Sequence, residues 1–504
     1  MLFNSIQFII FFPVVTTLYF LFRPRYRWLM LLLASCYFYM VFVPVYILVI
    51  LAIIGLDYFS GILIGKSTGN RRKLYFISSL ILNILILTFF KYYNFLNENI
   101  AFILKWFGIN DHLPFLNIII PLGLSFQILQ AISYLIEVYR GKQKAEKKFG
   151  VFMLYQMIYP RLIAGPIERP QNLLPQLTLP HKFDFNQLAA GLQLMAWGFF
   201  KKLVIADRLG QMVNNVYDFP ANFEGLSLVI ATIFYSFQIY LDFSGYTDIA
   251  LGAAEVMGFR LTSNFNRPYL SRSVAEFWQR WHITFSGWLR DYLYLPIAYS
   301  ASRKLRQDNY YGIRSDYFIY IYAVLITFLI CGLWHGSGWN FVIWGGMHGI
   351  FLILAILTRK PKSRMYRKMG VNKKSWSFNA FQTVVTFCLI SLAWVFFRAS
   401  TLSDAVYIIK HMFTGIPGNI RDIWHHPDML KYIVALDSPR NFIITLVILS
   451  VYIFIETRQK SWDIREMLRQ TPVLKRYCIY YVFILVFIFF GVFDSARQFI
   501  YFQF

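Results

Sequence analysis

Apolar residues recur along the whole chain in blocks that are long enough to cross a bilayer as helices, from Phe3 to Phe490. Because short polar segments separate the blocks, the pattern predicts an all-α polytopic integral membrane protein with about 11 to 13 transmembrane or re-entrant helices. The block 149–164 contains Pro160 and precedes Gly165 and Pro166, so we expect either a further span or a re-entrant piece. The expected spans are Phe3–Phe22, Trp28–Val43, Val45–Ile64, Leu74–Phe90, Ile118–Val138, Leu188–Ile205, Leu226–Leu251, Tyr317–Trp334, Trp339–Leu357, Phe378–Phe397, Phe442–Ile455 and Tyr477–Phe490.

Composition supports this interpretation. Of the 504 residues, 58% are hydrophobic and only 15% are charged, whereas soluble chains carry about 25% charged residues. A soluble enzyme with one anchor, a disordered chain and a fibrous protein are therefore excluded. The four cysteines, Cys36, Cys331, Cys388 and Cys478, lie singly in or beside apolar runs. We therefore predict neither a disulfide framework nor a metal site.

The net charge of +24 would suggest nucleic acid binding in a soluble protein. Here the basic residues cluster between apolar blocks, which is typical of cytoplasmic loops that meet anionic lipid. We expect the bilayer, and no nucleic acid, as the partner of these clusters. When the spans are followed in order, with the N-terminus outside and 149–164 counted as re-entrant, the basic clusters all fall on one side. Lys201 and Lys202 do not fit, because this order places them near the outer end of their span. The clusters on one side are Arg23–Arg27, Lys66–Lys73, Arg140–Lys148, Arg359–Lys374 and Arg458–Arg476.

The order of spans and loops suggests three parts. Residues 1–140 form N-terminal transmembrane helices, and residues 141–360 form a core that includes a cytoplasmic amphipathic segment at 273–297. Residues 361–504 form C-terminal transmembrane helices with a long external loop at 398–440. Since no soluble part is long enough to hold its own core, the chemistry must take place in or against the membrane.

Two histidines lie in a glycine-rich segment, CGLWHGSGWNFVIWGGMHG. His335 ends one span, and an ionisable side chain at membrane depth is costly unless it faces a cavity or a partner. His335 is therefore a candidate catalytic residue, with a packed, hydrogen-bonded histidine as the alternative. His348 lies about 20 Å further along a regular helix, so we do not expect direct contact between them. For His348, a hydrogen-bonded histidine packed in a glycine-rich helix interface is the alternative to a functional role.

A third histidine lies in the segment Ser273–Ile297. Its spacing puts Trp278, His282 and Phe285 on one face of an amphipathic, interfacial helix, with Arg280 elsewhere. His282 is then placed where a cytosolic acyl donor could approach, and a plain interfacial anchor is the alternative. Walker A, G-x-G-x-x-G, H-E-x-x-H and G-x-S-x-G motifs are not found in the sequence, which weakens ATP-driven transport and zinc hydrolysis as functions.

Several runs of residues resemble the membrane-bound O-acyltransferase family, in particular its branch of bacterial polysaccharide O-acetyltransferases that includes the alginate O-acetylation membrane protein. The resemblance covers nearly the whole chain, and the motifs occur in family order. The runs are YPRLIAGPIERP (159–170), GFFKKLVIADRL (198–209), YSFQIYLDFSGYTDIALGAAEVMGF (235–259), NFNRPYLSRSVAEFWQRWHITFSGWLRDYLYLPI (264–297), GLWHGSGWNFVIWGGMHG (332–349) and FIYFQF (499–504).

The resemblance implies a helical bundle around a central funnel and tunnel, in the inner membrane of a bacterium. His335 matches the family's catalytic histidine, and His282 matches its second histidine position. The residues expected near the donor or tunnel are Trp278, Arg280, Asp242, Ser244, Tyr246 and His348.

The activity that this implies is transfer of acetyl groups from a cytosolic thioester, with acetyl-CoA the expected donor and no tightly bound cofactor. The acceptor would be an exported or cell-surface polysaccharide such as alginate, and an extracytoplasmic O-acetyltransferase partner protein would complete the transfer. Alternatives are D-alanyl transfer to teichoic acid within the same family, and a transporter or flippase without chemistry.

Overall fold

The computed structural model describes residues 1–109, 113–305, 307–310, 312–436, 438–458, 464–493 and 499–500. Within these ranges, nine helices are long and apolar enough to cross a membrane. This confirms the all-α polytopic fold class. The nine are Tyr46–Lys66, Gly69–Trp106, Phe185–Tyr217, Leu226–Val256, Ser315–His335, Trp339–Leu357, Trp376–Arg398, Pro439–Arg458 and Val473–Phe490.

Nine of the twelve expected spans fall on these helices, and the other three are shorter. The first two expected spans form α1 (Ile6–Leu21) and α2 (Arg27–Met40). The fifth forms α6 (Leu124–Tyr139), so the first six residues of that expected span, 118–123, are not helical. Phe149–Met157 forms the nine-residue helix α7, and the chain then continues without regular helix to Arg169. Proline at position 160 explains this end, because proline cannot continue the helical hydrogen bonding.

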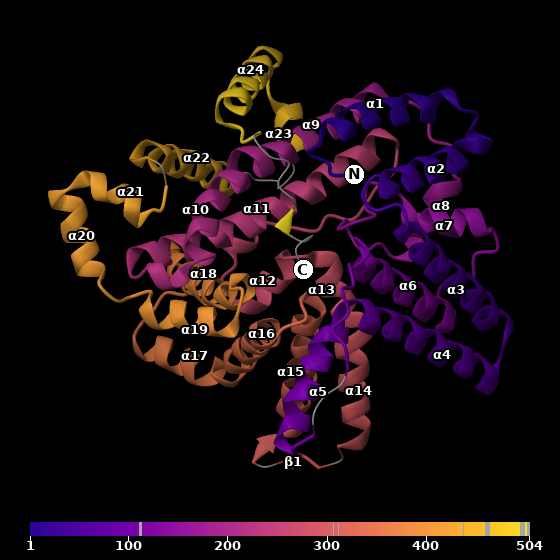
Figure 1. The fold of residues 1–504 in the computed structure, drawn as a ribbon, viewed down its shortest axis with the longest axis horizontal. Helices are drawn as coiled ribbons and strands as arrows, with labels where there is room; N and C mark the ends of the chain where they lie inside the picture. The colour runs from indigo at the N-terminus through magenta and orange to yellow at the C-terminus, as the bar shows by residue number, and fades with distance from the viewer. Residues whose placement is uncertain are drawn as a thin grey trace. The chain divides into compact units, whose positions relative to one another are not determined.

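The chain divides into two compact units, and the first consists of Met1–Gly198 and Tyr246–Ser263. Within it, α3 packs against α4 and α6, and α2 packs against α1 and α7, as Figure 1 shows. Its elements, in addition to those given above, are η1 (Pro24–Tyr26), α3 (Tyr46–Lys66), α4 (Gly69–Leu87), η2 (Thr88–Tyr92), α5 (Tyr93–Trp106), α8 (Pro170–Thr178) and α9 (Phe185–Phe199). Helix α11 (Leu226–Val256) contributes to both units.

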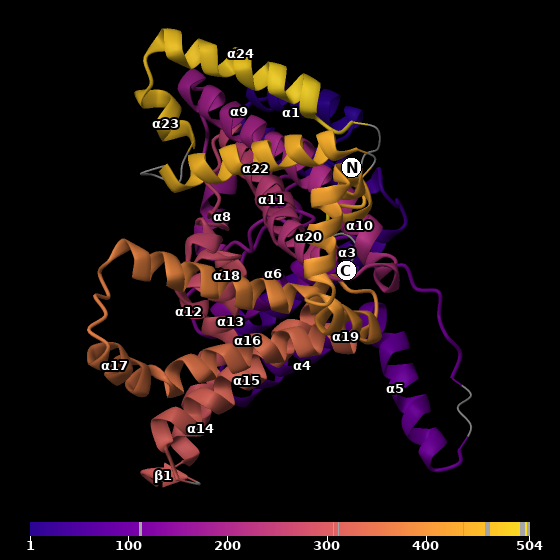
Figure 2. The same cartoon turned by 90° about the vertical axis from the view of Figure 1, so that its left-hand side faces the viewer.

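The second unit consists of Phe199–Gly245 and Asn264–Ile500. Helices α15, α16 and α18 lie side by side in it (Figure 2). Its elements are η3 (Phe200–Ala206), α10 (Asp207–Tyr217), η4 (Pro220–Asn222), η5 (Pro268–Leu270), α12 (Val274–Arg280), α13 (Ile283–Leu289), η6 (Arg290–Tyr294), α14 (Leu295–Lys304), β1 (Asn309–Tyr310), β2 (Ile313–Arg314), α15 (Ser315–His335), α16 (Trp339–Leu357), α17 (Arg359–Lys368), α18 (Trp376–Arg398), α19 (Leu402–His411), α20 (Ile416–His425), η7 (Pro427–Met429), α21 (Leu430–Ile433), α22 (Pro439–Arg458), α23 (Ile464–Gln470) and α24 (Val473–Phe490). The three sequence-based parts of the chain stay predictions.

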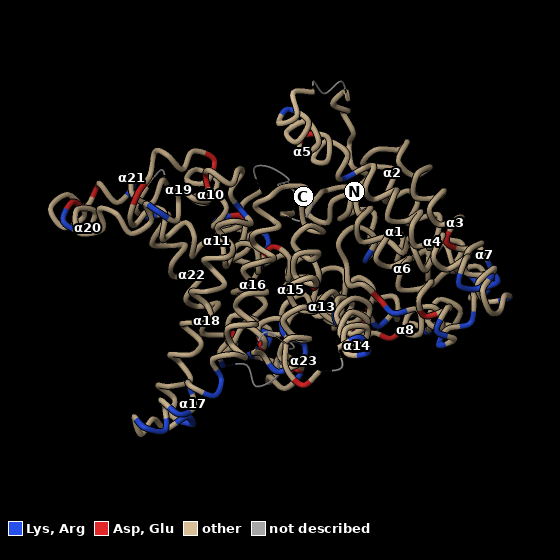
Figure 3. Tube along the Cα trace, turned by 90° about the horizontal axis from the view of Figure 1, so that it is seen from below, with Lys and Arg blue, Asp and Glu red and all other residues tan. Residues whose placement is uncertain are grey.

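The basic cluster 359–374 forms α17 and the turn after it, between the two apolar helices α16 and α18. Figure 3 shows Lys and Arg along α17. None of the residues of α17 is buried. A short basic helix between two spans is typical of a segment at the surface of an anionic membrane.

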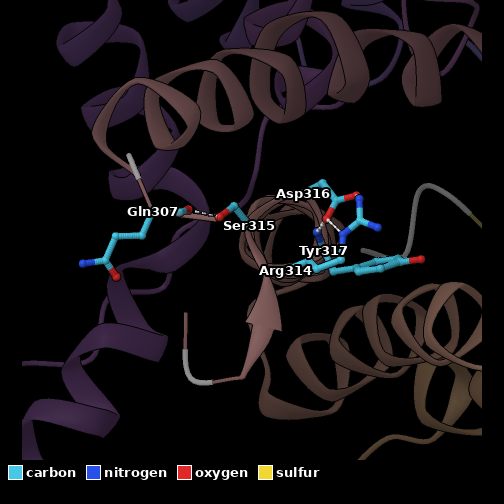
Figure 4. Close-up of polar contacts among 5 residues, drawn as sticks. All are labelled: Gln307, Arg314, Ser315, Asp316 and Tyr317. Atoms are coloured by element: carbon cyan, nitrogen blue, oxygen red, sulfur yellow. Dashed lines mark hydrogen bonds and ion pairs between the residues drawn. The ribbon is translucent and has the colours of Figure 1, made fainter. Parts of the chain in front are cut away.

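Helix α15 begins where the short antiparallel pair β1 and β2 ends. Figure 4 shows the polar contacts at this junction. Two of the three guanidinium nitrogens of Arg314, Nε and Nη2, donate to the Asp316 carboxylate at 3.2 and 2.9 Å. The Ser315 hydroxyl donates to the Gln307 carbonyl. Asp316 in the first turn also complements the positive end of the helix. These contacts fix the start of the helix whose last residue is His335.

Glycines allow α15 and α16 to approach closely. A Cβ at Gly345 would overlap the Phe328 carbonyl oxygen, and one at Gly332 would overlap the Phe341 carbonyl oxygen. Small residues at such crossings let helix backbones pack directly in membrane proteins. The glycine-rich segment therefore sets the distance between the two helices that flank His335.

We expect Gly345→Ala to lower the thermal stability of the purified protein strongly, because the new methyl group meets fixed backbone, as in overpacked cores that lose about 1–3 kcal/mol. Gly346→Ala is the matched control, since its Cβ would make only an ordinary 3.6 Å contact with Leu329. Thermal unfolding in detergent measures both. Equal melting temperatures for the two variants would contradict this account of the crossing.

Candidate active site

His335 is the last residue of α15, and Gly336 and Gly338 continue the chain in extended conformation toward α16. The side chain is buried, with 4% of the residue exposed. Four aromatic rings surround the imidazole, with centroid distances between 4.8 and 5.6 Å: Trp334, Trp344, Phe397 and Phe285. The ring of Phe341 lies where a Cβ on Gly336 would be, so the turn after His335 requires glycine. The sequence thus places an ionisable group in an aromatic pocket at a helix end.

His282 is completely buried and lies at the break between α12 and α13, with a left-handed backbone (φ 42°). Asn264 fixes this imidazole, because its Oδ1 lies 3.1 Å from His282 Nδ1. The same oxygen accepts hydrogen bonds from the backbone N–H and the hydroxyl of Thr284. Since Asn264 Oδ1 is an acceptor, His282 Nδ1 carries the proton and Nε2 carries the lone pair.

Phe285 brings the two histidines into one site. Its ring centroid lies 4.9 Å from that of His282 and 5.6 Å from that of His335. Phe285 lies on the first turn of α13, three residues after His282, so one short helix supplies both the histidine and the ring between the imidazoles. The two histidines that the sequence singles out separately therefore lie on either side of one aromatic ring, and their catalytic roles stay predictions.

Burial lowers the pKa of the His282 imidazole from its ordinary value of 6.5 to about 3. The unfolded chain therefore binds a proton near pH 6.5 that the folded protein excludes. This group contributes stability that is fully present above pH 6.5 and is lost as the pH falls toward 3. At physiological pH, the imidazole is neutral.

We expect wild-type protein to lose stability between pH 7 and pH 5 more steeply than His282→Gln, by up to about 1.4 kcal/mol for each pH unit. The reason is that glutamine has no group that takes up a proton when the chain unfolds in this pH range. Unfolding curves at several pH values, in one detergent, measure the difference between the two slopes. Parallel slopes would contradict a neutral, buried His282.

Trp278 and His348 also meet in this unit, and both were predicted near the donor or tunnel. The Trp278 indole Nε1–H donates to His348 Nδ1 at 3.2 Å. Trp344 lies between the histidines of α15 and α16, with ring centroids 4.9 Å from both His335 and His348. Direct contact between these two histidines was not expected, and the structure places an indole between them.

Asp242 lies in a buried ion network. Lys202 Nζ lies 2.6 Å from Asp242 Oδ1 and 2.9 Å from Asp207 Oδ1, and all three side chains are almost fully buried. The backbone N–H of Ile500 donates to Asp242 Oδ2 at 2.7 Å. This network explains why Lys202 does not follow the distribution of loop charges, because its charge is paired inside the protein. Lys201 is buried as well, with 7% of the residue exposed. Tyr501–Phe504, the rest of the FIYFQF run, lie outside the described residues.

The remaining predicted residues lie in different surroundings. Arg280 pairs with Glu276 at 2.6 Å on the half-buried side of α12. Ser244 is buried on α11 in the second unit. Tyr246 belongs to the first unit, where its hydroxyl accepts from the Ala164 N–H at 3.3 Å and its ring stacks on Phe3. The DFSGY run therefore does not form a single cluster.

The structure corrects the prediction of one amphipathic helix over 273–297. The segment is broken at Trp281 and His282 into α12 and α13, and it continues through the π-helical η6. The predicted face is buried, since Trp278, His282 and Phe285 are each less than 9% exposed. A helical wheel assumes unbroken geometry, and the left-handed residue at the break is decided by the contacts of Asn264.

Asn264 and Trp344 were missed as site residues, although both lie in runs that carry the family resemblance. Their roles depend on tertiary contacts with histidines 18 and 9 residues away, which no local pattern reports. Among the described residues, no group of three or more His, Cys, Asp or Glu side chains could hold a metal ion.

Comparison with known proteins shows which proteins this chain is similar to. The family model "MBOAT, membrane-bound O-acyltransferase family" matches residues 149–401, which include both histidines. The "Probable alginate O-acetylase AlgI" of Pseudomonas aeruginosa is 35% identical over 82% of this chain and 75% of its own length. The "Peptidoglycan O-acetyltransferase" of Helicobacter pylori is 33% identical over 83% of this chain and 80% of its own length.

A more distant similarity links the chain to the "Teichoic acid D-alanyltransferase" of Streptococcus thermophilus, which is 27% identical over 55% of this chain and 68% of its own length. The bacterial relatives and the apolar helices show a multi-pass protein of the inner membrane, and the family shows an acyltransferase. The family therefore argues against a transporter without chemistry. The chain belongs to the membrane-bound O-acyltransferase family.

Proposed function

We propose that this protein moves acetyl groups from a cytosolic thioester, acetyl-CoA, across the inner membrane for the O-acetylation of an exported or cell-surface polysaccharide. The observation that carries the proposal is the pair of buried histidines that meet across Phe285, within the residues that match the family. The names of the Pseudomonas and Helicobacter relatives support acetyl as the group and a polymer as the acceptor.

In this proposal His335 is the general base. A neutral imidazole accepts the proton of the attacking hydroxyl, whose oxygen forms a bond to the thioester carbonyl carbon. The tetrahedral oxyanion then collapses, the carbon–sulfur bond breaks, and the leaving thiolate takes its proton from the His335 imidazolium, which returns the neutral base. The products are an O-acetyl ester and a free thiol. His282 is the second catalytic histidine in this proposal. Because its Nδ1–H donates to Asn264 Oδ1, its Nε2 carries the lone pair that can accept a proton or a hydrogen bond.

Mass spectrometry of base-released esters tests the proposal. Surface and exported polymers are compared between cells that contain the protein and cells that lack it. Acetate that is present only with the protein supports acetyl transfer, whereas D-alanine in its place shows that the substrate is that of the teichoic acid relatives. No change in any ester would overturn the proposed function.

We further propose that the loop between α18 and α22 binds an extracytoplasmic partner protein that completes the transfer. Large apolar side chains on this loop are exposed, namely Phe413 at 71%, Trp424 at 83% and Tyr432 at 61%. Exposed aromatic residues are typical of binding surfaces, because aromatic side chains supply much of the energy of protein interfaces.

Replacing Phe413 and Trp424 by serine is expected to reduce polymer acetylation at least about tenfold, the effect of losing roughly 1.4 kcal/mol of binding. Thermal stability should change little because both side chains are exposed. Released acetate per inserted protein measures the effect, and Trp376→Ser, which removes another exposed tryptophan (84%), is the control. Full acetylation by the loop variant would rule out this surface.

A further inference from the structure

We propose that His348 is a positioning residue, which holds the helix before His282 against the helix that contacts His335. This inference rests on the proposed function, in which His282 and His335 act in one reaction. It adds a third histidine, which binds neither donor nor acceptor and acts through Trp278 and Trp344.

The first observation is the burial of a polar pair. His348 is 0% exposed and Trp278 is 7% exposed, and the hydrogen bond between them lies in the interior. Because Trp278 Nε1 can only donate, His348 Nδ1 must be the acceptor, and the proton of the neutral ring is on Nε2. Within the described part of the chain, Nε2 has no hydrogen-bond partner. The bond to Trp278 is therefore the polar contact that orients the ring.

The second observation is which elements this bond connects. Trp278 lies on α12, four residues before His282, and His348 lies on α16, four residues after Trp344. Trp344 contacts the imidazole of His335 edge to face, with an interplanar angle of 87°. One hydrogen bond thus joins the segment that ends at His282 to α16, the helix whose Trp344 packs on His335.

The contacts close into a ring around the site. His335 contacts Trp344, Trp344 contacts His348, and His348 binds Trp278. Helix α12 leads from Trp278 to His282, and Phe285 returns from His282 to His335. Since the backbone at His282 is left-handed and non-helical, helix geometry alone does not fix where α12 lies. The His348–Trp278 bond supplies that constraint.

Packing alone does not require a histidine at this position. Phe277, Phe328 and Trp394 also lie around the His348 ring, so an apolar residue of similar size would satisfy the same neighbours. A leucine would, however, leave the buried indole N–H of Trp278 without its acceptor, and buried donors without acceptors are costly. The expected consequence is a shift of α12, which misplaces His282 by the small distance that catalysis does not tolerate.

The test compares His348→Asn with His348→Leu in the full-length protein. The Oδ1 of asparagine can take the place of Nδ1, so His348→Asn should keep ester formation within about threefold of wild type, whereas His348→Leu should lose at least about tenfold. Trp278→Phe keeps an aromatic ring but removes the donor together with the five-membered ring that carries it, so it should lose at least as much as His348→Leu. The double variant Trp278→Phe/His348→Leu should lose no more than Trp278→Phe alone.

The readout is acetate released from surface polymer, normalised to inserted protein, together with the melting temperature in detergent. Equal activity of Asn and Leu variants at position 348 overturns the inference, as does multiplicative loss in the double variant. If His348→Leu does not insert, Trp278→Phe decides alone, and wild-type activity in that variant overturns the inference. His335→Ala separates the two claims: full acetate release by that variant would defeat the proposed function, whatever position 348 does.

Discussion

Replacing His335 by alanine is expected to abolish ester formation, with a loss of about 10²- to 10⁴-fold in transfer rate, the range of a lost general base. The reason is that alanine removes the imidazole at this end of α15, and the four aromatic rings around it, two phenyl rings and two indoles, supply no substitute base. Insertion should be normal, because the helix ends at this residue and its hydrogen bonding does not depend on the imidazole. Released acetate per inserted protein measures the loss.

His181→Gln is the matched control, since this half-buried histidine lies in the first unit, between α8 and α9, outside both the candidate site and the proposed partner-binding loop. It should leave ester formation unchanged. His335→Gln distinguishes the base from a simple hydrogen-bonding group, because glutamine can donate and accept but cannot take up the proton. Activity in correctly inserted His335→Ala or His335→Gln protein would mean that another group removes the proton.

Replacing Lys202 by methionine is expected to destabilise the second unit by about 3–5 kcal/mol, the cost of breaking a buried ion pair by removing one partner. Asp207 and Asp242 would then be buried without the ammonium group that lies 2.9 and 2.6 Å from them. The melting temperature and the fraction of protein that inserts correctly both report the effect. We expect the yield of folded protein to fall sharply.

Two variants locate the cause. Adding Asp207→Asn and Asp242→Asn to Lys202→Met should restore part of the lost stability, because no uncompensated charge is then left in the network. Arg290→Gln removes the exposed ion pair with Asp291, whose side chains are 67% and 32% exposed, and should change stability by less than about 1 kcal/mol. A triple variant as unstable as Lys202→Met would show that lysine packing, rather than its charge, holds the network together.

The apolar pattern determined the fold class by itself. Backbone polar groups in lipid must be paired within the protein, and continuous apolar blocks of about 20 residues achieve this as helices. Glycine and proline also acted locally: Pro160 ended α7, and the glycines after His335 made the turn into α16. The short helices α1, α2 and α6 differ from expectation because hydropathy does not determine where a helix stops.

The arrangement of the site was decided by tertiary structure. Sequence spacing singled out His335 and His282 separately, but the contact through Phe285 depends on how α13 packs against α15. The break at His282 replaced the continuous helix that periodicity predicted, because Asn264, 18 residues earlier, bonds the imidazole and the next turn. The ion pair of Lys202 also depends on tertiary structure, because its partner Asp242 lies 40 residues away along the chain and only folding brings the two charges together. The local sequence pattern predicts helix propensity and burial. It does not predict these contacts, because they join residues that are distant along the chain.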